Sequence, residues 1–305
     1  MTISNLEHLR NQTAVITGAG SGFGLEFARM GARLGMKLVL ADIQADALEA
    51  ARAEFAAAGV EVLAQVVDVS DGDQIQALAD ATMERFGAPH LLFNNAGVGA
   101  SGLIWESSIA DWNWNLGVNL WGVIHGVRLF TPLMLAAAEA DPEYRGHIVN
   151  VASMAGLVNA PGMGVYNVAK HAVVSLSETL YHDLSLVTQQ LHCSVLCPYF
   201  VPTGIARSER NRPADLANAG PMTRSQRVTG AMVVKAVESG RLTAADIAEL
   251  TFQGIADNRF YLVSHPKALS QVKDGADALV SLRNPPDPYA DRPELRTQLE
   301  TALRG

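Results

Sequence analysis

The sequence has few cysteines, and their spacing excludes a disulfide between them. The 305-residue chain contains two, Cys193 and Cys197, inside the apolar run LHCSVLCPYF. Positions four apart on a strand face the same side of a sheet but lie too far from each other to bond. Two thiols without a companion set of histidines or cysteines also make a poor zinc site. We therefore expect two buried free thiols, no metal and a reducing compartment.

Charge is scarce too, and acidic residues outnumber basic ones, 31 to 23. Only 18% of the residues are Asp, Glu, Lys or Arg, and the net charge is −8. General nucleic-acid binding needs a basic surface, so we expect no nucleic-acid partner. The apolar content of 49% supports a large core and excludes disorder over the whole chain.

Long apolar runs are also missing. No run approaches the roughly 18 apolar residues of a membrane span. The first residues, MTISNLEHLRNQ, lack the charged segment followed by an apolar one that marks a signal peptide. These absences predict a cytoplasmic protein without a membrane partner.

What the sequence does have is an alternation of short apolar runs with longer segments of helical period. Strands are predicted at 13–20, 37–43, 60–70, 90–97, 146–153, 192–198 and 259–264. Helices are predicted at 25–35, 45–59, 73–87, about 109–138 and from 164. This alternation is typical of βαβ units. It predicts an α/β fold, a Rossmann-type doubly wound parallel sheet of about seven strands with helices on both faces.

Two segments interrupt that rhythm within what we expect to be a single Rossmann-type domain over 1–305. Residues 201–240 are rich in Pro, Arg, Gly and Met, and we expect a lid-like insertion there. Residues 265–305 are expected to form a C-terminal extension with a helix over 267–283. The NPPDPYADRPEL that follows is not expected to be regular helix.

A glycine cluster, TGAGSGFG, lies between the first predicted strand and the first helix. Gly18, Gly22 and Gly24 give the spacing GxxxGxG rather than GxGxxG. Glycines let the backbone approach a pyrophosphate, and the helix N-terminus offers free N–H groups to it. The strand–loop–helix context therefore predicts a dinucleotide site, although loops often carry glycines for other reasons.

Polar or small residues follow the next strands. Asp42 closes the second strand, where a carboxylate can bind the adenosine ribose hydroxyls and would repel a 2′-phosphate, so NAD is favoured over NADP. A helix cap or turn is the alternative for Asp42. Asp68, after the third strand, can reach the adenine amino group. In NNAG, Asn95 can pin neighbouring strands and Ala96–Gly97 can leave room for ribose, or each can serve only in a turn.

A serine, a tyrosine and a lysine follow the fifth strand in SMAGLVNAPGMGVYNVAK. Tyr166 and Lys170 are four apart on one helix face, and Ser153 closes the strand. A free tyrosine titrates near 10, but a nearby ammonium and a positive nicotinamide ring favour its phenolate. This set suits alcohol oxidation, with Tyr166 taking the hydroxyl proton as hydride leaves. The alternative is an ordinary helix start with one aromatic packed inward.

Together TGAGSGFG, NNAG, Ser153 and YNVAK resemble the short-chain dehydrogenase/reductase family, in its single-domain branch, over residues 12–265. The resemblance implies that Tyr166 is the catalytic acid/base, that Lys170 binds the nicotinamide ribose and that Ser153 holds the substrate oxygen. It adds Asn119, in LGVNLWG, which matches a helix asparagine that anchors a water in a proton relay through Lys170. The predicted catalytic set is Asn119, Ser153, Tyr166 and Lys170.

The expected cofactor contacts come from the loop, the strand ends, the catalytic helix and the segment after the sixth strand. They are Gly18, Ser21, Gly22, Phe23, Gly24, Asp42, Ile43, Asp68, Val69, Asn95, Ala96, Gly97, Tyr166, Lys170, Pro198, Val201 and Thr203. One motif departs from the family, which usually has Pro-Gly where CPYFVPTGI has Pro198-Tyr199. The Tyr199 ring can narrow the substrate pocket, stack near the nicotinamide or pack as a surface aromatic.

The segment after Thr203 carries the substrate lid in this family. Its arginines can meet an anionic substrate group or form salt bridges in a solvated loop; they are Arg207, Arg210, Arg212, Arg224 and Arg227. Ile205, Leu216 and Met222 offer apolar contacts. We expect a small-molecule substrate, a medium-sized hydrophobic secondary alcohol or its ketone.

Four tryptophans around the long helix, Trp105, Trp112, Trp114 and Trp121, are typical of a core or a subunit interface. The family commonly forms tetramers through the helices that hold Asn119 and Tyr166, so a homo-oligomer is expected, a dimer or tetramer. Two other functions stay open at this point: an NADP-preferring carbonyl reductase of the same fold, and a non-catalytic dinucleotide sensor or scaffold.

Overall fold

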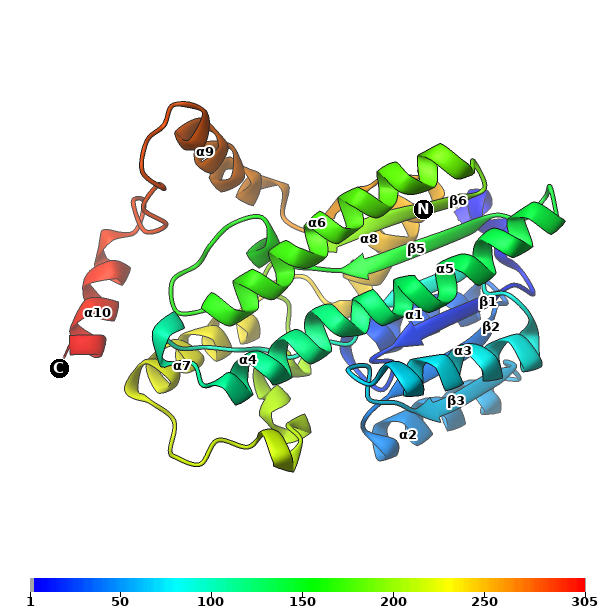
Figure 1. The fold of residues 1–305 in the computed structure, drawn as a ribbon, viewed down its shortest axis with the longest axis horizontal. Coiled ribbons are helices and arrows are strands. Elements are labelled where there is room, and N and C mark those ends of the chain that lie inside the picture. The colour runs from blue at the N-terminus through cyan, green and yellow to red at the C-terminus, as the bar shows by residue number, and fades with distance from the viewer. Residues whose placement is uncertain (1–2, 305) are drawn as a thin grey trace.

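Seven apolar runs form one sheet in the computed structural model, which describes residues 3–304 (Figure 1). The strands are β1 (Thr13–Thr17), β2 (Lys37–Asp42), β3 (Val62–Val66), β4 (Leu91–Asn94), β5 (Gly146–Val151), β6 (Leu191–Cys197) and β7 (Tyr261–Val263). Their order is β3-β2-β1-β4-β5-β6-β7, and every pairing is parallel. The predicted doubly wound sheet is confirmed. Several strands end earlier than predicted because the glycines and polar residues after them form loops.

Helices cover both faces of the sheet. On one face lie α1 (Gly22–Arg33), α2 (Ala45–Ala57) and α8 (Ala244–Ala256), and on the other α3 (Gly72–Phe86), α5 (Gly122–Ala140) and α6 (Gly164–Val187). Alternate residues of a strand enter different cores: Ile16 faces α1 and α8, whereas Val15 faces α3 and α5. Burial on both faces explains why the strands are almost continuously apolar. Both cysteines are free and buried, as predicted.

The long helix at 109–138 is interrupted at the residue that the resemblance singled out. α4 (Ile109–Leu116) continues into a π-helical turn, η3 (Gly117–Trp121), and then into α5. Asn119 lies in this turn, and π-turns occur often at functional sites. The stretch Ile109–Ala140 is long and apolar enough to cross a membrane, which the search for apolar runs did not predict. Because it packs on α3 and α6, we interpret it as a wall of the domain.

The last third of the chain adds α7 (Arg224–Glu238), α9 (Leu269–Val280) and α10 (Pro293–Arg304). α10 is a correction, because it includes the last residues of a segment not expected to be helical. Pro293 is its first residue, where a missing N–H costs nothing. Figure 1 shows α9 and α10 reaching away from the sheet, and α10 packs against α7. How these segments divide into domains, lid and extension stays a prediction.

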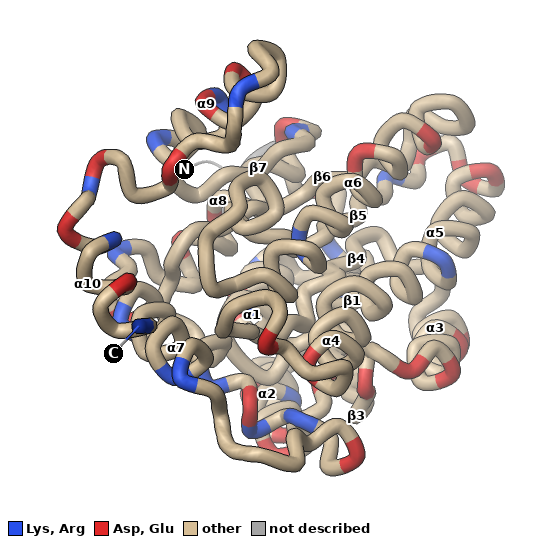
Figure 2. The backbone as a smooth tube through the Cα atoms, turned by 60° about the vertical axis from the view of Figure 1, so that its left-hand side comes forward, with Lys and Arg blue, Asp and Glu red and all other residues tan. Residues whose placement is uncertain are grey.

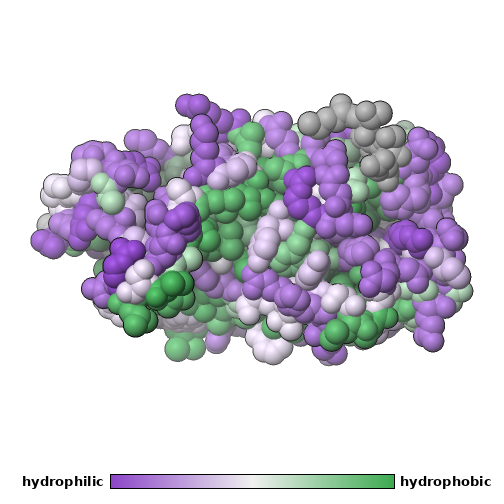
Figure 3. Space-filling model, turned by 90° about the horizontal axis from the view of Figure 1, so that it is seen from above, coloured by the Kyte–Doolittle hydropathy of each residue, from purple (hydrophilic) through white to green (hydrophobic). Residues whose placement is uncertain are grey.

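The surface of the molecule has both charged and apolar regions. Figure 2 shows basic positions on and around α7, beside α10. Seen from above, apolar side chains gather over the middle of the molecule between polar ends (Figure 3).

Candidate active site

The carboxyl ends of the central strands open into one large cleft of about 1210 Å³. The glycine loop, Asp42, Ser153, Tyr166 and Lys170 all line it. Pockets for one small ligand usually measure roughly 300–1,000 Å³, so this cleft has room for a dinucleotide and a second molecule.

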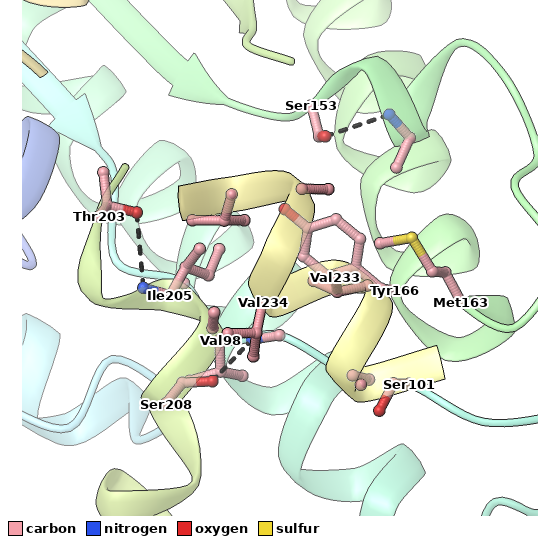
Figure 4. A pocket seen from close by; sticks show the side chains of 18 of the residues that line it. Val98, Ser101, Ser153, Met163, Tyr166, Thr203, Ile205, Ser208, Val233 and Val234 are labelled. Atoms are coloured by element: carbon pink, nitrogen blue, oxygen red, sulfur yellow. Dashed lines mark hydrogen bonds between the residues drawn. The ribbon is translucent and has the colours of Figure 1, made fainter. Parts of the chain in front are cut away.

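Ser153, Tyr166 and Lys170 meet at one end of the cleft. Ser153 begins a 3₁₀ turn, η4 (Met154–Gly156), and its hydroxyl accepts a hydrogen bond from the Ala155 N–H at 3.1 Å. Tyr166 and Lys170 lie one turn apart on α6, with the Lys170 Nζ 5.7 Å from the Tyr166 ring centre. Both are buried, and the Lys170 Nζ donates to the Val151 carbonyl at 2.8 Å. The structure thus brings the three side chains to the same cleft, and Figure 4 shows Ser153 and Tyr166 there.

Burial has the largest effect on the pKa values of Tyr166 and Lys170. It raises the pKa of Tyr166 to about 12, against a hydrogen bond with Ser153 that lowers this pKa. Burial also lowers the pKa of Lys170 to about 8. The side chains alone therefore do not make the phenol more acidic, as the lysine spacing had suggested. The oxidised nicotinamide of NAD would supply a further positive charge when bound.

Asn119 is fully buried beside this group. Its Nδ2 donates to the Val98 carbonyl at 2.8 Å, and its Oδ1 accepts from the Val98 N–H at 3.1 Å. A Cβ on Gly97 would lie 3.0 Å from the Asn119 Oδ1 and 3.7 Å from the Lys170 Nζ. Asn119 therefore fixes the loop after β4 next to Lys170. The water relay stays a prediction.

The glycine loop is shaped for an anion. Gly18 has a φ of +65°, and a Cβ there would lie 2.9 Å from the Ala96 Cα. A Cβ on Gly24 would lie 2.1 Å from the Gly18 carbonyl oxygen, so only glycine lets α1 approach the loop. Ser21 precedes α1 without capping it through its side chain, which leaves N–H groups of the first turn free. These residues fit the pyrophosphate of a dinucleotide.

The Asp42 carboxylate accepts hydrogen bonds from two backbone N–H groups and also lines the cleft. Its Oδ2 accepts from the Gly20 N–H at 2.8 Å, and its Oδ1 accepts from the Gln44 N–H at 2.9 Å. A carboxylate has about four acceptor sites, so two remain for ribose hydroxyls. Ile43 and Gln44 also line the cleft.

The two following strand ends carry Asp68 and Asn95. The Asp68 Oδ1 accepts from the Ser70 N–H and hydroxyl at 2.9 and 2.7 Å, while Asp68 and Val69 line the cleft. The Asn95 Nδ2 donates to the Thr17 carbonyl at 2.8 Å, which joins β4 to β1 as predicted.

Thr17 is a residue that the sequence reasoning missed. Its buried Oγ1 accepts from the N–H groups of Asn95 and Ala96 at 3.0 and 3.1 Å and so holds the loop after β4. Thr17 is the last residue of β1 before the glycine loop, and this position could have indicated its role.

The segment after β6 reaches the cofactor side of the cleft through Pro198, Val201 and Thr203. Cβ atoms on Gly22 and Thr203 would be 3.5 Å apart, so this segment lies over the glycine loop. Tyr199 lines the cleft, and its ring centre is 4.6 Å from that of Phe200 and 5.6 Å from that of His265. It therefore joins the wall of the cleft and packs on aromatic neighbours at the same time.

The segment 201–240, predicted to be a lid, is hydrogen-bonded to the loop after β4. The Gly99 N–H donates to the Ser208 Oγ at 2.9 Å, and the Leu103 N–H donates to the Ser225 Oγ at 2.9 Å. Figure 4 shows Met163, Val233 and Val234 close to Tyr166, and these apolar wall residues were also missed. The apolar face of α7 in GAMVVKAV was the signal for the last two.

The lid arginines do not act alike. Arg212 pairs with Asp111 at 2.7 Å and with Glu209 at 3.1 Å, over the ring of Trp114. Arg224 and Arg227 donate to backbone carbonyls, of Ala302 at 2.6 Å and of Met222 at 2.5 Å. Arg212 and Arg227 therefore stabilise the predicted lid segment, and Arg224 joins it to α10.

The tryptophans do not form one cluster. Trp114 is buried under Arg212, but Trp105 and Trp121 are 77% and 52% exposed. Trp114 is therefore a core residue, whereas for the exposed Trp105 and Trp121 the other alternative, a subunit interface, stays a prediction.

Comparison with known proteins identifies proteins that are similar to this chain in sequence and in structure. The family model for short chain dehydrogenase matches residues 12–214. A CLA biosynthesis dehydrogenase/reductase of Lactiplantibacillus plantarum is 32% identical over 278 residues, 90% of this chain and 96% of its own length. A C alpha-dehydrogenase of Sphingobium sp. is 31% identical over 90% of this chain and 87% of its own. A crystal structure of a short chain dehydrogenase/reductase from Burkholderia phymatum in complex with NAD is 54% identical, with a TM-score of 0.89, over 92% of this chain and 98% of that chain.

Proposed function

Because the chain belongs to the short-chain dehydrogenase/reductase family, we propose that it interconverts a secondary alcohol and a ketone with NAD as hydride carrier. Family membership makes it an oxidoreductase acting on CH–OH groups, as the sequence predicted. The observation that carries the proposal further is the meeting of Ser153, Tyr166 and Lys170 at one end of a cleft whose other end holds the glycine loop.

The proposed chemistry divides between the cofactor and this chain. The bound nicotinamide accepts or delivers the hydride. The Ser153 hydroxyl orients the substrate oxygen, and the Tyr166 oxygen takes the carbinol proton during oxidation or returns it during reduction. Lys170, held by the Val151 carbonyl, supplies positive charge below the phenol. Asn119 holds the loop at Gly97 that borders this lysine.

NAD is the preferred cofactor in this proposal. Asp42 lies where the adenosine ribose is expected and keeps acceptor sites free. A 2′-phosphate at the same place would meet its negative charge. The solved relative in complex with NAD supports the same choice.

The substrate is proposed to be apolar around its reacting carbon. The cleft wall nearest Tyr166 consists of Val98, Met163, Val233 and Val234 (Figure 4). A charged group next to the carbinol would lose its hydration against this wall. A medium-sized hydrophobic secondary alcohol fits it best.

We also propose that two or more copies associate. The helices on either side of Asn119 and Tyr166 expose Ile109 by 74%, Trp121 by 52% and Val168 by 45%. Such residues are typical of a covered surface, so we expect a dimer or tetramer. The buried free thiols fit the cytoplasm, which we propose as its location.

Replacing Tyr166 by Phe tests the function. The variant should still bind NADH but lose at least a hundredfold in turnover of secondary alcohols, measured as NADH absorbance. Tyr181→Phe, on the same helix and half-exposed, is the matched control and should keep full activity. Undiminished turnover by the Tyr166 variant would contradict the proposal.

A further inference from the structure

The adenosine half of the cleft, where the cofactor's phosphates are proposed to bind, has a negatively charged lining. The residues lining that half run from the glycine loop through the turns after β2 and β3. Within the part of the chain that the structure describes, the charged residues among them are Asp42 and Asp68, both negative. A pyrophosphate adds two further negative charges, so a cation from another part of the chain would stabilise it in addition to the N-terminus of α1.

Arg210 is the lid arginine that reaches this half. Its Nη2 donates to the Gln44 Oε1 at 3.2 Å, and Gln44 is itself bonded to Asp42. Its Nη1 donates to the Gly204 carbonyl at 3.1 Å, and Gly204 follows the Thr203 that lies over Gly22. The guanidinium therefore lies between the pyrophosphate loop and the ribose carboxylate, and it lines the cleft.

The bonding of Arg210 leaves it free to take an anion. It donates to the carbonyls of Gly204 and Arg207 and to Gln44, which uses three of its five N–H groups. The other two have no partner among residues 3–304, and no carboxylate in that range forms an ion pair with it. Its neighbour Arg212, in contrast, is paired with Asp111 and Glu209.

We propose that Arg210 binds the pyrophosphate of the dinucleotide and so fastens the lid when the cofactor is bound. This inference rests on the proposed function and concerns the same cleft. A guanidinium suits phosphate because it offers paired, fixed donors. The link through Gln44 joins the lid to the turn after β2, so cofactor binding and lid position become coupled.

Equilibrium binding to NADH, followed by its fluorescence, tests the proposal. Arg210→Gln should raise the Kd for NADH about tenfold, and Arg210→Lys should raise it less. The Kd of the unaltered chain should increase more steeply with salt than that of Arg210→Gln, because one ion pair is lost. Arg207→Gln is the matched control: it changes an exposed arginine of the same lid segment that does not line the cleft, and it should bind NADH normally.

NADPH separates the pyrophosphate from the 2′-phosphate as the group that Arg210 contacts. Equal loss of NADH and NADPH affinity in Arg210→Gln supports the pyrophosphate, and a loss confined to NADPH overturns it. Hydrogen exchange over 204–222 should slow on NADH binding in the unaltered chain and slow much less in Arg210→Gln. Normal NADH affinity in Arg210→Gln would overturn the inference and leave the proposed function standing. Failure of the unaltered chain to bind either dinucleotide would overturn both.

Discussion

The carboxylate of Asp42 accepts a hydrogen bond from the Gly20 N–H over 2.8 Å, which ties the end of β2 to the glycine loop. The residue proposed to select the cofactor is thus also a structural link of the loop proposed to hold the cofactor's phosphates. A substitution at Asp42 must keep an acceptor to separate the two roles.

Asp42→Asn meets that condition and should change the cofactor preference. It keeps one acceptor for the turn but removes the negative charge. The Kd for NADH should rise about tenfold or more, because a hydrogen bond to a charged group contributes roughly 1.5–3 kcal/mol. The Kd for NADPH should fall, because its 2′-phosphate is no longer repelled. Fluorescence titrations with both dinucleotides measure this. Asp46→Asn, on the exposed first turn of α2, is the control, and an unchanged ratio of the two Kd values would count against the role given to Asp42.

The pH dependence of turnover should report Tyr166 and Lys170. Because burial raises the pKa of Tyr166 to about 12, its neutral form prevails at neutral pH, and alcohol oxidation should accelerate as pH rises. Ketone reduction uses the protonated phenol and should not accelerate. Burial lowers the pKa of Lys170 to about 8, so the lysine is charged below that pH and neutral above it.

Replacing Lys170 by Met should therefore change the pH dependence of the oxidation rate. The oxidation rate of the unaltered chain divided by that of the variant should be largest below about pH 8 and shrink above it. Loss of ribose binding alone would reduce the rate by the same factor at every pH. Initial rates from pH 6 to 10 distinguish the electrostatic role from the loss of ribose binding. A ratio that stays constant over this range would contradict an electrostatic role for Lys170.

The structural features that the sequence could predict are those determined by residues close to one another along the chain. The alternation of runs predicted the sheet, and the glycine spacing predicted the tight loop between β1 and α1, because both follow from local patterns. The pairing of Tyr166 with Lys170 follows from helix geometry alone.

The remaining features depend on contacts between distant segments. The lid is held by Ser208 on Gly99 and by Arg212 on Asp111, partners about a hundred positions apart. Burial of Tyr166, which raises its pKa, likewise could not be predicted from neighbours along the chain. The exposure of Trp105 and Trp121 likewise could not be read from residue type, because a wide aromatic can cover a core or a surface.

Buried histidines at the opposite end of the sheet should make the fold sensitive to acid. Burial lowers the pKa of His147 to about 3 and that of His90 to about 4. Both values lie below the 6.5 of an unfolded histidine, so protons bind the unfolded chain preferentially. The stabilisation is complete above about pH 6.5 and is lost as pH falls below it, by roughly 2 kcal/mol at pH 5 for the fully buried His147 and by less for the partly buried His90.

His147→Gln should remove one of these two contributions. Urea unfolding at pH 7.5 and at pH 5 measures the loss of stability on acidification, and the variant should lose roughly 2 kcal/mol less than the unaltered chain. His182→Gln changes an exposed histidine and should lose as much as the unaltered chain. Equal losses in all three proteins would show that His147 does not carry this sensitivity.

The contact between α10 and α7 should affect large substrates more than small ones. Leu299 is 9% exposed against α7, and the Arg224 Nε donates to the Ala302 carbonyl at 2.6 Å. Leu295, Leu299 and Tyr289 line the outer part of the cleft, far along the chain from the catalytic residues. Leu299→Asp places a charge in an apolar contact and should detach α10. The KM for bulky alcohols should then rise several-fold, while the KM for small alcohols and the Kd for NADH stay unchanged. Thr297→Asp adds the same charge on the exposed side of α10, and identical kinetics of the two variants with every alcohol would mean that α10 is no wall of the substrate site.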